Sequence, residues 1–166
     1  MQLVFSKDQI KQAIQKIADQ VSEYLEQVQE DVHFVTVLRE GIHFSIDLAQ
    51  KLEKYSLIFD YIFLENVNPN NRELAIEKDI FLPVKDKTVL LCSVLIRTGY
   101  EISFIENYLR IRGCKQIKTV SLICKKGAYK KPDFYYFLTE PSDYLVGYGL
   151  DYNEKYRNLQ EIYKIK

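Results

Sequence analysis

The chain has 166 residues, which is enough for one domain with a hydrophobic core and too few for two. Its 23 Lys and Arg residues balance 23 Asp and Glu residues, so the formal net charge is zero. Nucleic-acid binders and anionic-membrane binders need surplus positive charge, so we expect neither kind of partner. A hydrophobic content of 47% and a charged content of 28% are typical of a globular protein and exclude a disordered chain.

The three cysteines are odd in number and form no CxxC or Cys/His motif. Cys92 and Cys124 lie in apolar runs that predict buried strands, so we interpret both as core thiols rather than metal or redox ligands. No run reaches the roughly 18 apolar residues of a membrane helix, and the N-terminus lacks the pattern of a signal peptide. These features predict a cytoplasmic protein.

The first predicted element is a long amphipathic helix. Ser6 and Gln9 fit a capping box, in which a hydroxyl at the start of a helix is paired with a Gln three residues later. Apolar residues then recur at three- and four-residue steps and form one stripe. These residues are Ile10, Ile14, Ile17, Val21, Leu25 and Val28.

The rest of the chain alternates between strand-like and helix-like patterns. A nearly continuous apolar run at residues 88–96 is typical of a central parallel strand that is buried on both faces. Residues 65–72 are polar and rich in turn formers, which predicts a loop, and Gly113 stands where a helix ends. The predicted strands are residues 32–38, 57–63, 80–82, 88–96, 117–124, 134–138 and 162–165, and the later predicted helices are residues 44–52 and 102–111.

This order of elements predicts an α/β fold with an open, mostly parallel central sheet flanked by helices. Ligands of such sheets bind at the carboxyl ends of the strands, in the turns that precede the helices. The turns to consider are therefore residues 38–41, 97–101 and 125–127.

The turn at residues 97–101 has two interpretations. Free backbone N–H groups, the Thr98 hydroxyl and the positive end of a helix suit a phosphate group. However, every strand-to-helix turn that contains a Gly looks similar, and a carboxylate at Glu101 repels an anion while it stabilises the empty helix. The local sequence favours an ordinary structural turn over a phosphate site.

Residues 143–152 bring aromatic side chains, an acid and two glycines within ten positions. Flat rings such as that of Tyr144 could stack on a planar base, and Asp151 could hold a divalent ion. Equally, a Tyr-rich segment could simply cover the edge of a sheet. The local pattern leaves both interpretations open.

The longest motif of the chain lies in the same region. It comprises Lys131-Pro132-Asp133-Phe134, Val146-Gly147-Tyr148-Gly149-Leu150-Asp151-Tyr152-Asn153-Glu154 and Tyr156-Arg157-Asn158-Leu159. These segments closely resemble the C-terminal signature of the hypoxanthine-guanine phosphoribosyltransferases, and the similarity runs almost from end to end. The resemblance implies the type I phosphoribosyltransferase fold, with a small hood formed by the C-terminal segment, as a single phosphoribosyltransferase-like domain over residues 1–166. It also implies synthesis of IMP or GMP from a purine base and phosphoribosyl pyrophosphate, with Mg²⁺ as cofactor.

The same resemblance assigns roles to individual residues. Lys125 matches the lysine that donates to the purine 6-oxo group, Tyr144 matches the aromatic residue that stacks on the base, and Leu145 matches the residue whose backbone reads the edge of the base. Asp151 matches a magnesium-linked acid, and Arg157 matches an arginine that contacts pyrophosphate. The phosphate-binding turns of the family fall at Arg39, Glu40, Thr98 and Gly99.

The phosphoribosyl motif departs from the family pattern. Ser93 and Val94 replace two acids that hold the ribose hydroxyls, and Arg97 replaces the aspartate that acts as general base towards purine N7. Glu101 replaces a threonine that binds the 5′-phosphate, and Glu40 replaces a glycine of the pyrophosphate loop. Arg97 cannot accept a proton, because the pKa of arginine stays above about 12 in proteins.

Two functions are compatible with these departures. One is a divergent enzyme that still makes IMP or GMP. The other is a catalytically inactive protein that keeps a pocket for a purine base or nucleotide. In the second case Arg97 could neutralise a phosphate directly, or it could pair with Glu101, four residues later. Our hypothesis is that the pair of Arg97 and Glu101 helps fill the vacated 5′-phosphate pocket.

The resemblance further implies a homodimer or homotetramer. The contact would include the helix at residues 42–52, with Phe44 and Leu48 as contributors. His33 and His43 have no acid or cysteine partners at useful spacing, so we interpret both as structural and not as metal ligands.

Overall fold

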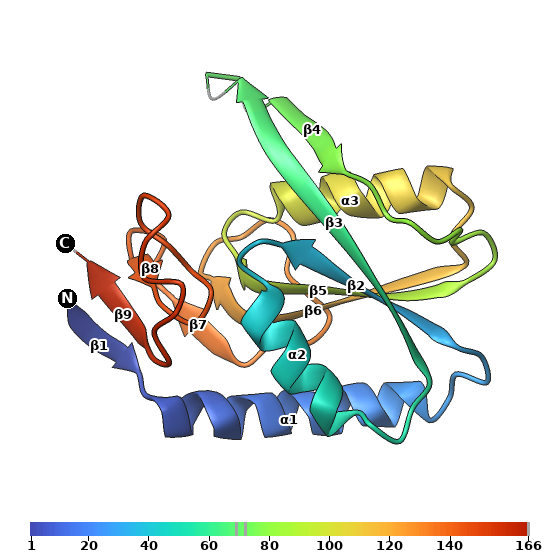
Figure 1. The fold of residues 1–166 in the computed structure, drawn as a ribbon, viewed down its shortest axis with the longest axis horizontal. Coiled ribbons are helices and arrows are strands. Elements are labelled where there is room, and N and C mark those ends of the chain that lie inside the picture. Colours follow the sequence, from blue (N-terminus) through green and yellow to red (C-terminus); the bar gives the residue numbers. More distant parts are fainter. Residues whose placement is uncertain (69, 72, 166) are drawn as a thin grey trace.

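A six-stranded sheet forms the centre of the computed structural model, which describes residues 1–68, 70–71 and 73–165. The strands lie in the order β4-β3-β2-β5-β6-β7 (Figure 1). Neighbouring strands are parallel, except that β4 is antiparallel to β3. The strands are β2 (Val32–Leu38), β3 (Leu57–Asn68), β4 (Glu73–Lys78), β5 (Thr88–Ile96), β6 (Gln116–Lys125) and β7 (Phe137–Thr139). The predicted α/β fold is confirmed.

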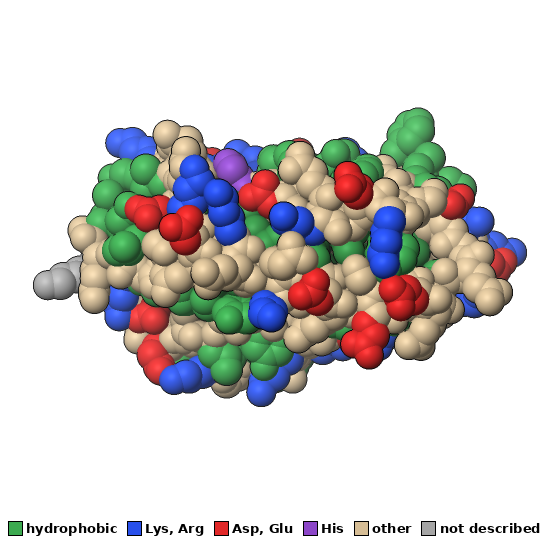
Figure 2. Space-filling view, turned by 90° about the horizontal axis from the view of Figure 1, so that it is seen from below, with side chains coloured by type: hydrophobic (Ala, Val, Ile, Leu, Met, Phe, Trp, Pro, Cys, Tyr) green, Lys and Arg blue, Asp and Glu red, His purple; other side chains and the backbone are tan. Residues whose placement is uncertain are grey.

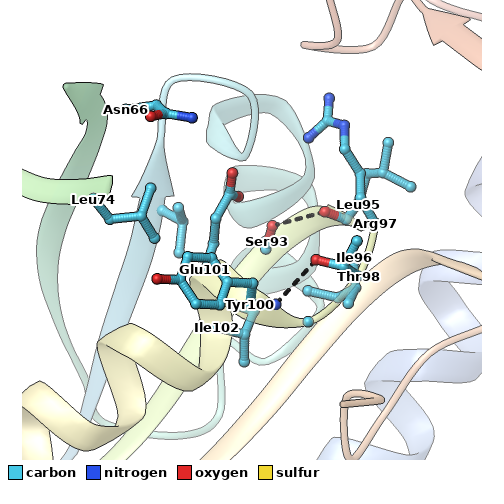
Figure 3. A pocket seen from close by; sticks show the side chains of 12 residues that line it. Asn66, Leu74, Ser93, Leu95, Ile96, Arg97, Thr98, Tyr100, Glu101 and Ile102 are labelled. Atoms are coloured by element: carbon cyan, nitrogen blue, oxygen red, sulfur yellow. Dashed lines mark hydrogen bonds between the residues drawn. The ribbon is translucent and has the colours of Figure 1, made fainter. Parts of the chain in front are cut away.

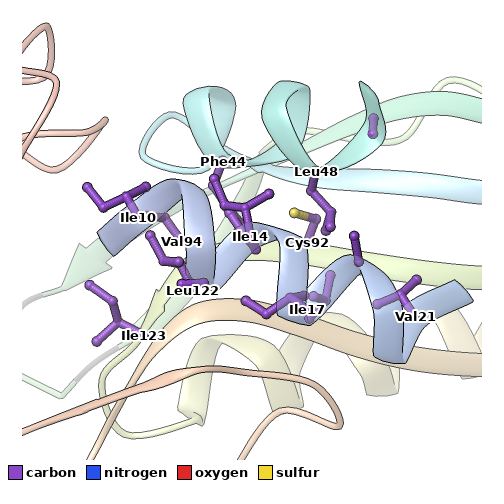
Figure 4. Close-up of a cluster of buried hydrophobic side chains, with 14 of the residues drawn as sticks. Ile10, Ile14, Ile17, Val21, Phe44, Leu48, Cys92, Val94, Leu122 and Ile123 are labelled. Atoms are coloured by element: carbon purple, nitrogen blue, oxygen red, sulfur yellow. The ribbon is translucent and has the colours of Figure 1, made fainter. Parts of the chain in front are cut away.

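Helices cover both faces of this sheet (Figure 1). α1 (Lys7–Leu25) and α2 (Ile42–Lys51) lie on one face, and α3 (Tyr100–Ile111) lies on the other. Figure 4 shows the apolar stripe of α1 and the inner side of α2 meeting the side chains of β5 and β6. Each large apolar side chain buried there contributes roughly 1.5–3 kcal/mol by leaving water. This core fixes the positions of β5 and β6, and the turns of the candidate site follow the carboxyl ends of these strands.

The capping box of α1 is confirmed. The Ser6 hydroxyl accepts a hydrogen bond from the backbone of Gln9 at 3.3 Å, and the Gln9 side chain accepts one from the backbone of Ser6 at 2.9 Å. The helix ends at Leu25, three residues before the end of the predicted stripe. Val28 still packs against the core, but its N–H donates to the Leu25 carbonyl in a turn beyond the helix. The apolar stripe therefore extends beyond the end of the helix.

A separate three-stranded antiparallel sheet forms the hood. It consists of β1 (Gln2–Phe5), β9 (Ile162–Ile165) and β8 (Tyr144–Val146) in that order, so the two ends of the chain lie side by side (Figure 1). The Phe5 and Phe137 rings stack with centroids 3.8 Å apart, and the Tyr148 hydroxyl donates to Asp47 of α2 at 2.5 Å. The hood therefore includes the N-terminal strand β1, which the sequence did not predict.

The polar segment that was interpreted as a loop is strand at residues 65–68 and turn at residues 70–71, so the loop interpretation was wrong for its first half. β3 continues through Asn68, β4 begins at Glu73, and the two strands form a long hairpin; residues 69 and 72 lie outside the described part. Asn66 pairs with Leu74, and Glu65 pairs with Ala75. Cross-strand pairing overrides the weak strand propensity of these polar residues.

The strand predicted at residues 80–82 is absent from the described structure. The backbone N–H groups of Phe81 and Leu82 each donate to the buried carboxylate of Asp60, at 2.8 Å. Donors that are bound to a side chain cannot join a strand ladder. The segment that returns from the hairpin is β4.

The burial of two cysteines and of two apolar residues of α2 tests two further predictions. Cys92 and Cys124 are both fully buried, which confirms them as core thiols. Phe44 and Leu48 are also fully buried in the core, so the prediction that they take part in a contact between subunits was wrong. The exposed apolar side chains of α2 are those of Ile42 and Ile46.

The described surface carries charged side chains of both signs. Figure 2 shows acidic and basic side chains interspersed over the face that α1 covers. This distribution agrees with the net charge of zero. Within residues 1–68, 70–71 and 73–165, no helix is long and apolar enough to cross a membrane.

Candidate functional site

The turns after β2, β5 and β6 lie together at one edge of the central sheet, because parallel strands end on the same side. The turn after β5 and the start of α3 border a pocket of about 200 Å³, which Val37 of β2 also lines (Figure 3). Ser93, Thr98 and Glu101 line this pocket, which we call the α3 pocket. Asn66 and Leu74 of the β3–β4 hairpin line its other side, which explains the role of the polar segment in the fold.

Gly99 shapes the turn that opens α3. Its φ angle is 89°, in the left-handed region, and a Cβ atom here would lie 2.4 Å from the Lys130 carbonyl oxygen. Thr98 Oγ1 accepts a hydrogen bond from the Tyr100 N–H at 3.2 Å. The glycine turn between strand and helix is thus as the sequence predicted. The Thr98 hydroxyl in it already accepts the hydrogen bond of the first N–H of the helix.

Arg97 and Glu40 form a bidentate ion pair between the turns after β5 and β2. The two terminal nitrogens of Arg97 lie 2.8 and 3.0 Å from the two carboxylate oxygens of Glu40. Burial works against the charge of Arg97, but the hydrogen bonds to Glu40 and the charges of Glu40 and Glu101 outweigh it and raise the pKa of Arg97. The predicted pairing of Arg97 with Glu101 was wrong: a bidentate partner across the site competes better than a carboxylate on the same turn.

Glu101 points into the α3 pocket (Figure 3). It forms no hydrogen bond or ion pair within the part of the chain that the structure describes. Partial burial raises the pKa of Glu101; the positive charge of Arg97 acts in the opposite direction, and the carboxylate of Glu40 adds to the increase. The pocket therefore contains a carboxylate with unused acceptor capacity.

A second charged cluster lies between the β2 turn and the hood. Arg39 pairs with Glu154 at 3.1 Å, and Arg157 pairs with Glu154 at 3.2 Å and with Asp151 at 3.0 Å. Arg157 also donates to the Gly149 carbonyl at 2.8 Å. A cavity of about 170 Å³ brings Arg39, Arg157, Glu40, Arg97 and Glu101 together. The sequence-predicted phosphate-binding residues are thus neighbours, but their charges are already paired within the protein.

The three residues at the purine end lie on β6 and β8. Lys125 Nζ donates to the Pro141 and Asp143 carbonyls at 2.8 and 2.6 Å, which leaves one of its three protons free. Burial, with help from the charge of Arg97, lowers the pKa of Lys125. The Tyr144 side chain is about half exposed, whereas Leu145 is buried. The arrangement offers an exposed ring, a hydrogen-bond donor and a buried backbone edge.

The residues present do not fit a magnesium ion. Asp151 Oδ1 is bound to Arg157, and Asp151 Oδ2 accepts from the Glu154 N–H at 2.9 Å. Ser93 and Val94 supply no carboxylate, and the described residues contain no group of three or more His, Cys, Asp or Glu side chains that could hold a metal. Mg²⁺ is usually held by one or two carboxylates together with water and substrate phosphates, and both oxygens of Asp151 are already engaged within the protein.

Two contributors to the site were not identified from the sequence. Glu154 bridges Arg39 and Arg157; its spacing of three residues from Arg157 was the available signal. Tyr148 lies between two glycines with a φ of 51° and is buried against α2, where His43 lies 5.9 Å from its ring. Nothing in the local sequence marks its partner Asp47, because the two residues are far apart in the chain.

Comparison with known proteins agrees with the fold. The sequence model described as phosphoribosyl transferase domain matches residues 6–153. The chain therefore belongs to the phosphoribosyltransferases. Hypoxanthine-guanine phosphoribosyltransferase of Bacillus subtilis is 31% identical, with 99% of this chain and 92% of that protein aligned. Within the phosphoribosyltransferases, the chain thus belongs to the hypoxanthine-guanine phosphoribosyltransferase family.

Further similar proteins and solved structures carry the names of the same family or of its close variants. Hypoxanthine-guanine-xanthine phosphoribosyltransferase of Tritrichomonas foetus is 28% identical over 96% of this chain and 88% of that protein. Among solved structures, hypoxanthine-guanine phosphoribosyltransferase of Bacillus anthracis superposes with a TM-score of 0.91 at 23% identity, covering 100% of this chain and 99% of the other. Hypoxanthine phosphoribosyltransferase of Trypanosoma cruzi, complexed with IMP, gives 0.92 at 19%, covering 100% and 91%. The structural matches establish the fold.

Proposed function

We propose that this chain binds a purine base, nucleoside or nucleotide and does not transfer a phosphoribosyl group to it. The supporting observation is the bidentate ion pair of Arg97 with Glu40. It joins the two turns that a transferase of this family would use for the pyrophosphate and ribose of its substrate. In this chain the two side chains satisfy each other, so a substrate would have to displace this bidentate pair to enter.

The chemistry of transfer supports the same conclusion. A purine nitrogen must form a bond with C1′ of the ribose as pyrophosphate leaves, and the purine must lose a proton. Arg97 cannot take that proton, and the loss of a positioned general base costs about 10²–10⁴ in rate. Ser93 and Val94 cannot give the ribose hydroxyls the charge-assisted hydrogen bonds that carboxylates supply, each worth about 1.5–3 kcal/mol.

The purine end supports retained binding. The free proton of Lys125 would donate to a 6-oxo group, the exposed ring of Tyr144 would stack on the base, and the backbone of Leu145 would bind the edge of the base. Rings that stack in an offset arrangement gain about 0.5–1.5 kcal/mol beyond their buried area. A purine with a 6-oxo group is therefore the ligand class.

A divergent enzyme that still makes IMP or GMP is the second candidate. The observation that favours it is the retained turn of Thr98 and Gly99 at the start of α3, together with 31% identity to the Bacillus subtilis relative. Water would have to remove the purine proton in that case. No step through magnesium is part of this candidate, because Asp151 and Glu40 are already paired with arginines.

The proposal also covers the domain organisation, the cellular location and the partners of the chain. A single phosphoribosyltransferase-like domain in the cytoplasm agrees with three cysteines that form no disulfide. For a homodimer or homotetramer, we assign the contact to the exposed Ile42 and Ile46 of α2 in place of the buried residues. Binding of nucleic acid is not part of the proposal, since the chain has no surplus positive charge.

The test is a direct assay with phosphoribosyl pyrophosphate and hypoxanthine, guanine or xanthine, together with calorimetry of the same bases. We expect no turnover by the natural protein and measurable binding of hypoxanthine or guanine. The combined variant Ser93→Glu, Val94→Asp, Arg97→Asp and Glu101→Thr should gain turnover. Arg110→Asp, which makes the same charge change as the Arg97→Asp part of this variant but on the exposed surface of α3, is the control and should not gain turnover.

Each outcome decides part of the proposal. Turnover by the natural protein at rates ordinary for enzymes would establish the second candidate. Absence of both turnover and purine binding would overturn the purine pocket itself. Hypoxanthine binding that survives replacement of Lys125 by Met would show that the pocket lies elsewhere.

A further inference from the structure

We propose that the α3 pocket accepts the unphosphorylated sugar of a purine nucleoside and excludes a 5′-phosphate. This inference rests on the proposed purine-binding function and narrows it to one ligand class. The ligand would be a 6-oxopurine nucleoside with a free 5′-hydroxyl group, rather than a nucleotide. Position, charge and hydrogen-bonding capacity each support this choice.

The position of the α3 pocket relative to the purine end is the first argument. Ile96 of β5 pairs with Cys124 of β6, so Arg97 and Lys125 follow the ends of neighbouring parallel strands. Arg97 and Glu101 both line that pocket. A sugar attached to a base at Lys125 and Tyr144 would therefore extend past Arg97 into the α3 pocket. Its volume of about 200 Å³ is several times the roughly 30 Å³ share of one liquid water molecule, so it has room for a sugar.

Charge is the second argument. The start of a helix attracts anions, but Glu101 already places a carboxylate in the first turn of α3. Arg97 does not offset this for a ligand, because both of its terminal nitrogens donate to Glu40. The wider cluster holds three arginines and four carboxylates, so it lacks the surplus positive charge that a phosphate needs. Its members are Arg39, Arg97, Arg157, Glu40, Glu101, Asp151 and Glu154.

Hydrogen-bonding capacity is the third argument. An ionised carboxylate only accepts hydrogen bonds, and a sugar hydroxyl has a proton to donate, whereas a fully ionised phosphate has none. Glu101 has unused acceptors, and Asn66 and Ser93 bring neutral polar side chains to the same pocket (Figure 3). The Ser93 hydroxyl is held only by a 3.4 Å bond to the Leu95 carbonyl, so it can turn towards a ligand. The pocket is thus complementary to hydroxyl groups.

Calorimetry with hypoxanthine, inosine and IMP tests the inference on the intact protein. We expect inosine to bind about tenfold or more tightly than IMP, because juxtaposed like charges are strongly unfavourable. Glu101→Gln keeps the size of the side chain and removes its charge. It should reduce the preference for inosine over IMP by about tenfold while hypoxanthine binding stays the same. Glu23→Gln, on the exposed side of α1, removes the same charge far from the pocket and should leave all three affinities unchanged.

The outcomes separate this inference from the proposed function. If hypoxanthine binds and IMP binds as tightly as inosine or more so, the purine pocket stands and the exclusion of phosphate is wrong. The exclusion is also wrong if Glu101→Gln leaves the ratio of inosine to IMP affinity unchanged. If hypoxanthine, inosine and IMP all fail to bind, both the proposed function and this inference fall.

Discussion

Gly149 of the hood lies directly on the backbone of Glu40. A Cβ atom at position 149 would stand 2.2 Å from the Glu40 carbonyl oxygen, and the φ angle of Gly149 is 95°. The carbonyl of Gly149 accepts a hydrogen bond from Arg157. One glycine therefore sets the separation between the hood and the turn that carries the ion pair of Glu40 with Arg97.

Replacement of Gly149 by Ala should lower the free energy of unfolding by about 1–3 kcal/mol, because it adds a steric clash to an unfavourable φ angle. Chemical denaturation measures this change. Gly127→Ala is a matched control, since Gly127 also has a positive φ angle of 77° but its added Cβ would meet nothing within 4 Å. Equal losses in the two variants would show that backbone strain alone acts and that the contact with Glu40 has no energetic effect.

The ion pair of Arg97 and Glu40 should show a coupling free energy of about 0.5–1 kcal/mol. It is bidentate, but both side chains remain partly open to solvent, which limits the gain. A double-mutant cycle with Arg97→Met and Glu40→Gln, measured by denaturation at low and high salt, gives this value. A cycle between Arg97 and Glu101 should give less, because those side chains form no ion pair in the described structure. A larger coupling free energy between Arg97 and Glu101 than between Arg97 and Glu40 would support the pairing that the sequence predicted.

Glu101 should make the protein less stable as the pH rises towards neutrality. Its pKa is raised in the folded protein by partial burial, with Arg97 opposing the increase and Glu40 adding to it. A carboxyl group with a raised folded pKa binds its proton more tightly when folded. Its stabilising contribution is complete below the ordinary carboxyl pKa and is lost as the pH rises through the folded value.

Glu101→Gln should therefore raise the melting temperature near pH 7 and have little effect near pH 4. The gain at pH 7 should stay below about 1 kcal/mol, because the side chain is open to solvent on one side. Thermal denaturation of both proteins across this pH range measures the difference. A gain of the same size at both pH values would contradict the role of the charge.

The strongly periodic and strongly apolar parts of the fold could be predicted from the sequence. The run at residues 88–96 became β5 with the same bounds, and the capping box of Ser6 starts α1. β1 and β8 were missed, although the equally short β9 was predicted with its observed bounds, because three or four side chains seldom show a clear period. The hairpin at Asn66 was missed because its strands are stabilised by pairing between residues that are separated in the sequence.

Most charged residues of the candidate site were predicted from the sequence, but their pairings were not. The resemblance placed Arg97, Glu101 and Glu40 in one site, and the structure brings them together. The partner of Arg97 could not be predicted, because spacing along a helix identifies Glu101, whereas the position of Glu40 depends on the order of strands in the sheet. Likewise, the engagement of Asp151 by Arg157 depends on how the hood folds back on itself.

The hydrogen bond from the Tyr148 hydroxyl to Asp47 should be the main polar link between the hood and α2. Burial, together with the hydrogen bond to Asp47, raises the pKa of Tyr148, so the hydroxyl stays protonated and donates throughout the physiological range. Tyr148→Phe should cost about 1.5–3 kcal/mol of stability, the range for hydrogen bonds to charged groups. It should also increase amide hydrogen exchange in β8 more than in β5, because only the hood loses an anchor. Tyr136→Phe, at an exposed ring whose hydroxyl has no hydrogen bond within the described residues, is the control. A uniform loss of protection in β5 and β8 would mean that this bond supports the whole fold rather than the docking of the hood.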